Sequence, residues 1–324
     1  MAANASIELP QGKQGSVVFE TINGKTYVKK TYNKHTNTNK SLRNREYNAL
    51  IALKSCPHIV NVRENSSPNS KNIYTQYGEG GDLFDYIKDI TKKLPVESRT
   101  IIGEGKMTEL RIDKSVIPLE IQKKEMISID KIYTILFQLL SALHCMHKHN
   151  YYHLDLKPEN IVFTDKEKQN IAIIDFGYAH HNSNATKSCA FARGTLLFSS
   201  PQKRKRMTDP IASRYICGKD DIYALGTIIK HLNEIVCVVA VYDTNQFKYR
   251  ALYKRLNDFI TNTTKEEEKD RWDLNAIKVW FNELDIYKTL VNEGIYDECH
   301  KQLHSNNGGS QKAKRKTRKQ TPRR

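Results

Sequence analysis

The stretch His153-Leu-Asp-Leu-Lys-Pro-Glu-Asn160 decides the fold of this chain, together with Asp175-Phe-Gly177, which begins fifteen residues after Asn160. On an extended loop, side-chain alternation places Asp155 and Lys157 on the same side. One such octet could be an ordinary polar loop. The second stretch at this distance makes that interpretation far weaker, so we treat the two as parts of one site.

The two stretches resemble the catalytic loop and the metal-binding loop of the eukaryotic-type protein kinases, and Lys157 is typical of their serine/threonine branch. The resemblance covers about residues 8–281. It implies that Asp155 accepts or orients the proton of the attacking hydroxyl and that Lys157 reaches the transferring phosphoryl group. It also implies that Asn160 and Asp175 hold Mg²⁺, for which Mn²⁺ could substitute, on bound ATP.

The segment Pro10-Gln-Gly12-Lys-Gln-Gly15-Ser-Val17 resembles the glycine-rich loop of this family, with Pro10 in place of the first glycine. Glycines let backbone N–H groups approach phosphate without a Cβ in the way. Without the other motifs, a simple turn would explain the segment equally well. We expect Gly12, Gly15 and Val17 to contact the nucleotide.

The ATP-binding lysine of the third strand is Lys29 or Lys30, and strand alternation favours Lys30. That register places the small apolar Val28 over the adenine and Tyr32 in the core, whereas the other register places a bulky tyrosine on the nucleotide. The expected partner of the lysine is Glu46 on the following helix. The alternative is that Glu46 is a solvated helix charge.

Residues 73–77 and the glycines that follow resemble the hinge between two lobes. The resemblance implies that Tyr77 and Gly78 offer backbone groups to adenine and that Thr75 guards the rear of the pocket. Asp82 is placed to meet the ribose or a basic substrate residue, and it should also cap a helix.

Several residues depart from the family pattern or support it from outside the site. Leu154 stands where most kinases have arginine, which predicts that the usual cationic pocket for an activation-loop phosphate is missing. Gln202 replaces a glutamate, so its bond to Arg271 should be neutral. Thr195 should bond towards Asp155 and Lys157, and Asp221 should brace the catalytic loop.

The excess positive charge behind the net charge of +16 lies largely in residues 312–324, and a second basic run lies at 203–206. Residues 203–206 could attract acidic or prephosphorylated protein substrates, or could be a solvated surface. Residues 312–324 resemble a nuclear import signal or a solubilising tail, and any nucleic-acid contact through them should be weak and salt-sensitive. We expect an intracellular protein, in the nucleus or the cytoplasm.

Six scattered cysteines without a CxxC pair argue against a zinc site and against a disulfide framework, and they favour a reducing compartment. The N-terminus lacks the pattern of a signal peptide. The longest apolar stretch, 235–242, is too short to span a bilayer and should be core. We therefore expect a monomer without membrane contact.

The expected fold class is α+β: a bilobal kinase fold with a small β-rich lobe at 7–77 and a larger, mainly α-helical lobe at 78–304. The Asn23-Gly24 step predicts a hairpin within 7–32. Apolar spacing predicts helices at 38–53, 129–149, 222–235, 249–260 and 274–284, and another helix beginning at 82. Segment 91–128 is expected to be an irregular insertion, and 305–324 a disordered basic tail.

Three functions fit these residues. An active kinase is favoured because no catalytic position is vacant. A pseudokinase scaffold would account for Pro10, Leu154 and Gln202, and a module tethered to nucleic acid would assign the main role to the tail. The loosened motifs and the short C-terminal lobe resemble kinases of divergent or viral lineages.

Overall fold

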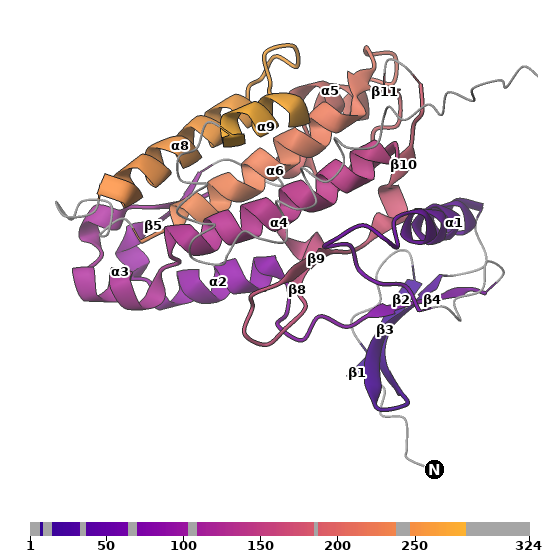
Figure 1. Cartoon of the computed structure of the whole chain (residues 1–324), viewed down its shortest axis with the longest axis horizontal. Helices are drawn as coiled ribbons and strands as arrows, with labels where there is room; N and C mark the ends of the chain where they lie inside the picture. The colour runs from indigo at the N-terminus through magenta and orange to yellow at the C-terminus, as the bar shows by residue number, and fades with distance from the viewer. Residues whose placement is uncertain are drawn as a thin grey trace, which may run out of the picture.

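The computed structural model describes residues 7–8, 15–32, 37–63, 70–102, 109–184, 187–237 and 247–282. Within them the chain forms a small lobe based on a β-sheet and a larger lobe built mainly from helices (Figure 1). This arrangement confirms the predicted α+β, two-lobed fold class.

The small lobe contains a four-stranded antiparallel sheet in the order β1-β2-β3-β4. Its strands are β1 (Ile7–Glu8), β2 (Gly15–Ile22), β3 (Lys25–Tyr32) and β4 (Asn72–Gln76). The predicted hairpin joins β2 and β3. Its turn residues Asn23 and Gly24 have φ angles of 53° and 76°, the left-handed values that a tight hairpin turn requires.

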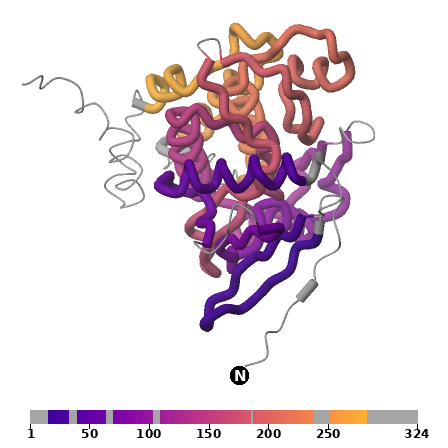
Figure 2. Tube along the Cα trace, turned by 90° about the vertical axis from the view of Figure 1, so that its right-hand side faces the viewer, coloured from indigo at the N-terminus to yellow at the C-terminus, as the bar shows by residue number. Residues whose placement is uncertain are grey.

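Helix α1 (Asn37–Ala52) connects the sheet to the larger lobe. Leu42, Ala49 and Leu50 are buried at helical spacing, which explains why this segment folds as a helix against the core. The helix packs against β3 and against the 3₁₀ turn η5 (Phe176–Tyr178). Figure 2 shows it running between the sheet and the helices of the larger lobe.

The larger lobe is built around α4 (Ile129–Lys148) and α6 (Cys217–Glu234), which pack against each other. Its other helices are α2 (Leu83–Lys93), α3 (Leu119–Glu125), α5 (Pro201–Thr208), α8 (Phe247–Thr263) and α9 (Leu274–Asn282). All the helices predicted from apolar spacing are present. Helix α6 begins five residues earlier than expected.

Short antiparallel strand pairs organise the loops of the larger lobe. They are β7 (Tyr151–Tyr152) with β10 (His180–His181), β8 (Ile161–Phe163) with β9 (Ile171–Ile173), and β11 (Ser188–Cys189) with β12 (Tyr215–Ile216). The 3₁₀ turns η4 (Pro158–Asn160) and η6 (Leu196–Phe198) continue these loops. The loop 153–160 lies between β7 and β8, and the loop 174–179 lies between β9 and β10. Paired strands therefore hold both ends of the two loops that carry the candidate catalytic residues.

Segment 91–128, predicted to be irregular, is largely ordered. It contains η1 (Val96–Ser98), a hairpin of β5 (Arg99–Ile102) and β6 (Glu109–Ile112), η3 (Lys114–Val116) and α3. Lys230 of α6 pairs with Glu109 at 3.1 Å, and Lys114 donates to the carbonyl of Asn233 at 2.8 Å. The prediction was wrong because elements this short show little periodicity and depend on such tertiary contacts.

Two disulfide bonds contradict the expectation of unpaired cysteines. Cys56 is bonded to Cys145 and Cys189 to Cys217, with Cα–Cα distances of 5.6 and 5.5 Å. The partners are 89 and 28 residues apart in sequence, so their spacing gave no sign of the pairing. Because these four cysteines are paired, the cysteines no longer argue for a reducing compartment.

The predicted basic tail, 305–324, lies outside the described residues, as do residues 283–304. Of the apolar stretch 235–242, the described part ends at 237, and Ile235 and Val236 are buried as expected. Among the described residues, no helix combines the length and apolar character needed to cross a membrane.

Candidate active site

A buried carboxylate holds the loop that carries Asp155. Asp221, on α6, accepts the backbone N–H groups of His153 and Leu154 at 3.0 and 2.9 Å, and Nε2 of His147 lies 2.9 Å away. Burial alone would raise the pKa of Asp221, but its bonds to His147 and to the loop backbone lower that pKa below its ordinary value. The bracing role predicted for Asp221 matches these contacts.

Asp155 and Lys157 meet at the hydroxyl of Thr195. Oδ1 of Asp155 accepts the backbone N–H of Thr195 at 2.8 Å and its hydroxyl at 2.9 Å. Nζ of Lys157 donates to the same hydroxyl at 3.1 Å and lies 3.7 Å from Oδ2 of Asp155. Oδ1 accepts both bonds from Thr195, and Oδ2 is the Asp155 oxygen nearest to Lys157.

Asn160 and Asp175 come from adjoining ends of the paired strands β8 and β9, where the N–H of Ile174 donates to the carbonyl of Asn160 at 2.9 Å. The side-chain amide of Asn160 donates to the carbonyl of Asp155 at 2.8 Å, which leaves its amide oxygen for a cation. The Asp175 carboxylate is 40% exposed. An amide oxygen and a carboxylate are ligands that suit Mg²⁺.

Lys30 lies between two carboxylates that are distant in sequence. Its Nζ is 3.0 Å from Oε2 of Glu46 on α1 and 2.7 Å from Oδ1 of Asp175. Lys29 instead pairs with Glu20 at 3.0 Å on the other side of the sheet. Of the two lysines that the sequence left open, Lys30 therefore has the expected partner.

The two carboxylates share one cation, but their pKa values shift in opposite directions. Burial raises the pKa of the Glu46 carboxyl to about 7, against the opposing effect of Lys30. For Asp175, burial acts in the same direction, but the closer contact with Lys30 holds its pKa below the ordinary value. Burial would lower the pKa of Lys30, yet the two carboxylates together raise it. Lys30 is therefore charged over the whole range in which proteins are stable.

The apolar residues predicted around the nucleotide share a sheet face with Lys30. Val17 is its direct cross-strand partner, and Val28 lies two residues before it on β3. Cross-strand partners and alternate residues of a strand lie on the same face. Gly15 is the first residue of β2, and Gly12 lies outside the described residues.

The predicted hinge approaches the larger lobe closely at Gly78. A Cβ added there would lie 2.8 Å from the carbonyl oxygen of Phe163, so the position requires glycine. The ring of Tyr77 packs edge-on against Phe19 at 4.9 Å, and Tyr77 also lines a cavity of about 780 Å³ beside the β2–β3 turn. Asp82 caps α2 by accepting a backbone N–H at 2.8 Å, and burial raises its pKa.

Most of the basic run 203–206 belongs to the fold. Lys203 is 1% exposed, pairs with Asp220 at 2.9 Å and donates to a carbonyl of the catalytic loop. Arg204 and Arg206 donate to backbone carbonyls, and Lys205 is exposed. The interpretation of 203–206 as a solvated surface is therefore wrong for Lys203, and Lys205 is the one exposed residue of the four.

The predicted neutral bond between Gln202 and Arg271 is present at 2.9 Å. Sequence reasoning missed the structural roles of Lys203 and His147. No signal in the sequence marks Lys203 as buried. His147 follows the buried Met146 on α4, and its place at the edge of the apolar face could have pointed to a buried partner.

The comparisons with known proteins point to one family. The family model described as protein kinase domain matches residues 5–279. Calcium-dependent protein kinase 6 of Plasmodium berghei is 35% identical over 191 residues, which cover 58% of this chain and 10% of that protein. Serine/threonine-protein kinase ULK3 of Xenopus laevis is 32% identical over 98 residues, covering 30% and 19%. Meiosis induction protein kinase IME2/SME1 of Saccharomyces cerevisiae is 33% identical over 122 residues, covering 33% and 18%. The chain thus matches less than a fifth of the length of these relatives.

Proposed function

Because the chain belongs to the protein kinase domain family, we propose that it is an active serine/threonine kinase that transfers the γ-phosphate of Mg-ATP to hydroxyl groups of other proteins. The observation that carries the proposal is the position of Lys30, whose Nζ contacts both Glu46 and Asp175. These contacts would hold a cation for the phosphates, its helix partner and a metal ligand in one fixed arrangement. Such preorganisation is the main source of catalysis in phosphoryl transfer.

The phosphates are expected to lie beside Lys30. Glu46 keeps the ammonium group in place, and Asp175 with the amide oxygen of Asn160 would hold the divalent cation. When bound, that cation neutralises negative charge on the phosphate oxygens. Since Asp175 would be a ligand of the cation and also contacts Lys30, these two residues would act at the same phosphates.

The hydroxyl of the substrate is expected to approach Oδ2 of Asp155. That carboxylate accepts or orients the hydroxyl proton, while Lys157 is close enough to contact the transferring phosphoryl group. Thr195 contacts both side chains and would fix the distance between them.

The base and ribose of the nucleotide would lie between the sheet and the larger lobe. Val17 and Val28 supply an apolar face, Gly12 and Gly15 supply backbone N–H groups near the phosphates, and the backbone at Tyr77 and Gly78 meets the adenine edge. Asp82 remains the proposed contact for the ribose or for a basic substrate residue.

The test is transfer of labelled phosphate from ATP, with Mg²⁺, to generic serine/threonine peptides of basic and acidic composition. Asp155→Asn and Asp175→Ala are the controls. We expect phosphoserine or phosphothreonine that is absent with both variants. ATP binding without transfer above these controls would refute catalysis and favour a scaffold.

The remaining proposals concern partners and location. Preference for acidic or prephosphorylated substrates would depend on the exposed Lys205, and the same peptides test it. We propose a monomer in the nucleus or cytoplasm, with residues 312–324 serving as an import signal that contacts nucleic acid weakly. Deleting residues 305–324 should change localisation and leave transfer to a soluble peptide intact.

A further inference from the structure

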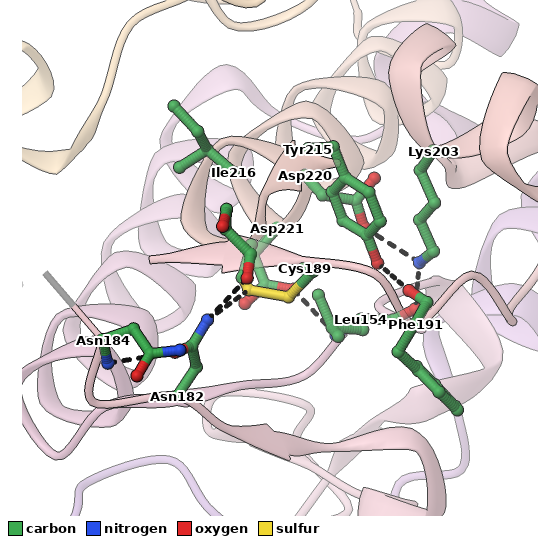
Figure 3. Close-up of a disulfide and its surroundings, with 12 residues drawn as sticks. Leu154, Asn182, Asn184, Cys189, Phe191, Lys203, Tyr215, Ile216, Asp220 and Asp221 are labelled. Atoms are coloured by element: carbon green, nitrogen blue, oxygen red, sulfur yellow. Dashed lines mark hydrogen bonds and ion pairs between the residues drawn. A yellow bond between two sulfur atoms is a disulfide. The ribbon is translucent and has the colours of Figure 1, made fainter. Parts of the chain in front are cut away.

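One disulfide crosses from the activation segment, residues 175–202, to the helix that braces the catalytic loop. Cys189 of β11 is bonded to Cys217, the first residue of α6, and both side chains are fully buried. Cys189 lies six residues before Thr195, and Cys217 lies four residues before Asp221. The bond therefore joins the segment that contacts the Asp155 carboxylate to the helix whose Asp221 holds the backbone N–H groups of the two residues before Asp155. Figure 3 shows the disulfide beside Leu154 and Asp221.

The bond lies in a small apolar cluster that also contains Leu154, the residue before Asp155. Leu154 is 1% exposed and stands where most kinases have arginine. An apolar residue here cannot attract a phosphate on the activation segment. The activation segment therefore needs another stabilising contact to keep Thr195 hydrogen-bonded to Asp155.

Other contacts hold the same part of the segment. Strands β11 and β12 pair around the disulfide, with Cys189 opposite Tyr215. The hydroxyl of Tyr215 donates to the carbonyl of Phe191, and the guanidinium of Arg45 on α1 lies 4.6 Å from the centre of the Phe191 ring. Figure 3 shows Phe191 and Tyr215 joined on one side of the bond. The strand pairing and the Tyr215 bond use neutral groups, and the Arg45 guanidinium lies against the Phe191 ring.

We propose that the Cys189–Cys217 disulfide positions the activation segment in place of a phosphate, so that the oxidised enzyme is active without phosphorylation of this segment and the reduced enzyme is less active. The inference rests on the proposed kinase function and adds its mode of regulation. Cys189 and Cys217 are positioning residues, since they act on Asp155 through Thr195 and Asp221.

Formation of the bond is an ordinary thiol oxidation. The two thiols lose two protons and two electrons as their sulfurs join, and a small-molecule disulfide accepts them and becomes two thiols. A dithiol reductant reverses the step. Because both sulfurs are buried, exchange should be slow in the folded protein.

The experiment compares two double variants of the full chain, purified under oxidising conditions. The segment variant is Cys189→Ser with Cys217→Ser, and the control variant is Cys56→Ser with Cys145→Ser, which removes the other disulfide. Steady-state kinetics are measured on one peptide, at a temperature at which circular dichroism shows every protein to be folded.

We expect the segment variant to lose about tenfold or more in kcat, as misplacement of catalytic groups does, with ATP affinity nearly unchanged. The control variant should keep the wild-type kcat. Prolonged dithiol treatment should lower the kcat of the control variant, and a small-molecule disulfide should restore it, while the segment variant responds to neither. Equal kcat values for both variants and the wild type would overturn the inference, as would full activity in a sample whose peptide map shows Cys189 and Cys217 as free thiols.

A second measurement does not depend on catalysis. Trypsin can cut the segment after Lys187 and after Arg193, and the segment variant should be cut there faster than the control variant. Equal cleavage rates would also overturn the inference. If the oxidised wild type transferred no more phosphate than Asp155→Asn, the proposed function would be refuted. The cleavage rates alone would then decide whether the disulfide positions the segment.

Discussion

Glu46→Gln is expected to flatten the pH dependence of the free energy of unfolding. The Glu46 side chain is buried, and burial raises the pKa of its carboxyl from 4.5 to about 7. In the unfolded chain that pKa returns to its ordinary range. Because the folded state binds this proton more tightly, Glu46 stabilises the fold at low pH, and the contribution is lost as pH rises through the folded pKa.

The magnitude follows from the same two values. At about 1.36 kcal/mol per pH unit, the difference between 4.5 and about 7 corresponds to about 3 kcal/mol. About 2 kcal/mol of this should be lost between roughly pH 5.5 and 8, where most of the carboxyl titrates in the folded protein. The glutamine variant has no proton to exchange at this site, so its stability should lack this slope.

The assay is urea unfolding followed by circular dichroism across that pH range. The matched control is Glu20→Gln, which removes the carboxylate that pairs with Lys29 on the sheet surface, and its curve should run parallel to that of the wild type. A Glu46→Gln curve that also runs parallel to the wild type would refute the reasoning. If the wild type instead gained stability relative to Glu46→Gln as pH rises, the sign of the predicted pH dependence would be wrong.

Three further predictions concern single positions or pairs. Lys30→Met should lower phosphoryl transfer about 100-fold or more, whereas Lys29→Met should change it little because Lys29 pairs with Glu20 on the other side of the sheet; similar losses for both would contradict the assignment. Removing the bond between Cys56 and Cys145 should lower the free energy of unfolding by up to about 4.6 kcal/mol, since it closes a loop of 89 residues, and a denaturant titration that shows no loss would disprove this. Gly78→Ala should cost about 1–3 kcal/mol and weaken ATP binding in calorimetry, because its Cβ would lie 2.8 Å from a backbone oxygen of β8; unchanged stability and affinity would mean that the hinge shifts freely.

The parts of the fold that the sequence predicted well are those with a strong local cause. Asn23 and Gly24 specify a tight turn by their own conformational preferences, and the apolar stripe of 129–149 is long enough to define α4. The preference for Lys30 over Lys29 followed from strand alternation, which depends on neighbouring residues alone. The structure agrees at each of these positions.

The features that could not be predicted depend on contacts between distant segments. Cys189 and Cys217 meet because β11 pairs with β12, and nothing in their spacing indicates that pairing. Lys203 belongs to a run of four cations, but Asp220 and a loop carbonyl satisfy it in the core. The elements of 91–128 are likewise stabilised by the end of α6 more than by local propensity.

Adjacent residues of α1 contact the two lobes, Glu46 the sheet of the small lobe and Arg45 the larger lobe. Glu46 faces Lys30, while Arg45 covers the ring of Phe191. Moving the helix outward would break both contacts together, so this displacement costs more than loss of the ion pair alone. Inhibitors that fill the nucleotide site with α1 in place should therefore be favoured over those that require the helix to swing away, a selectivity set by one aromatic ring outside the binding site.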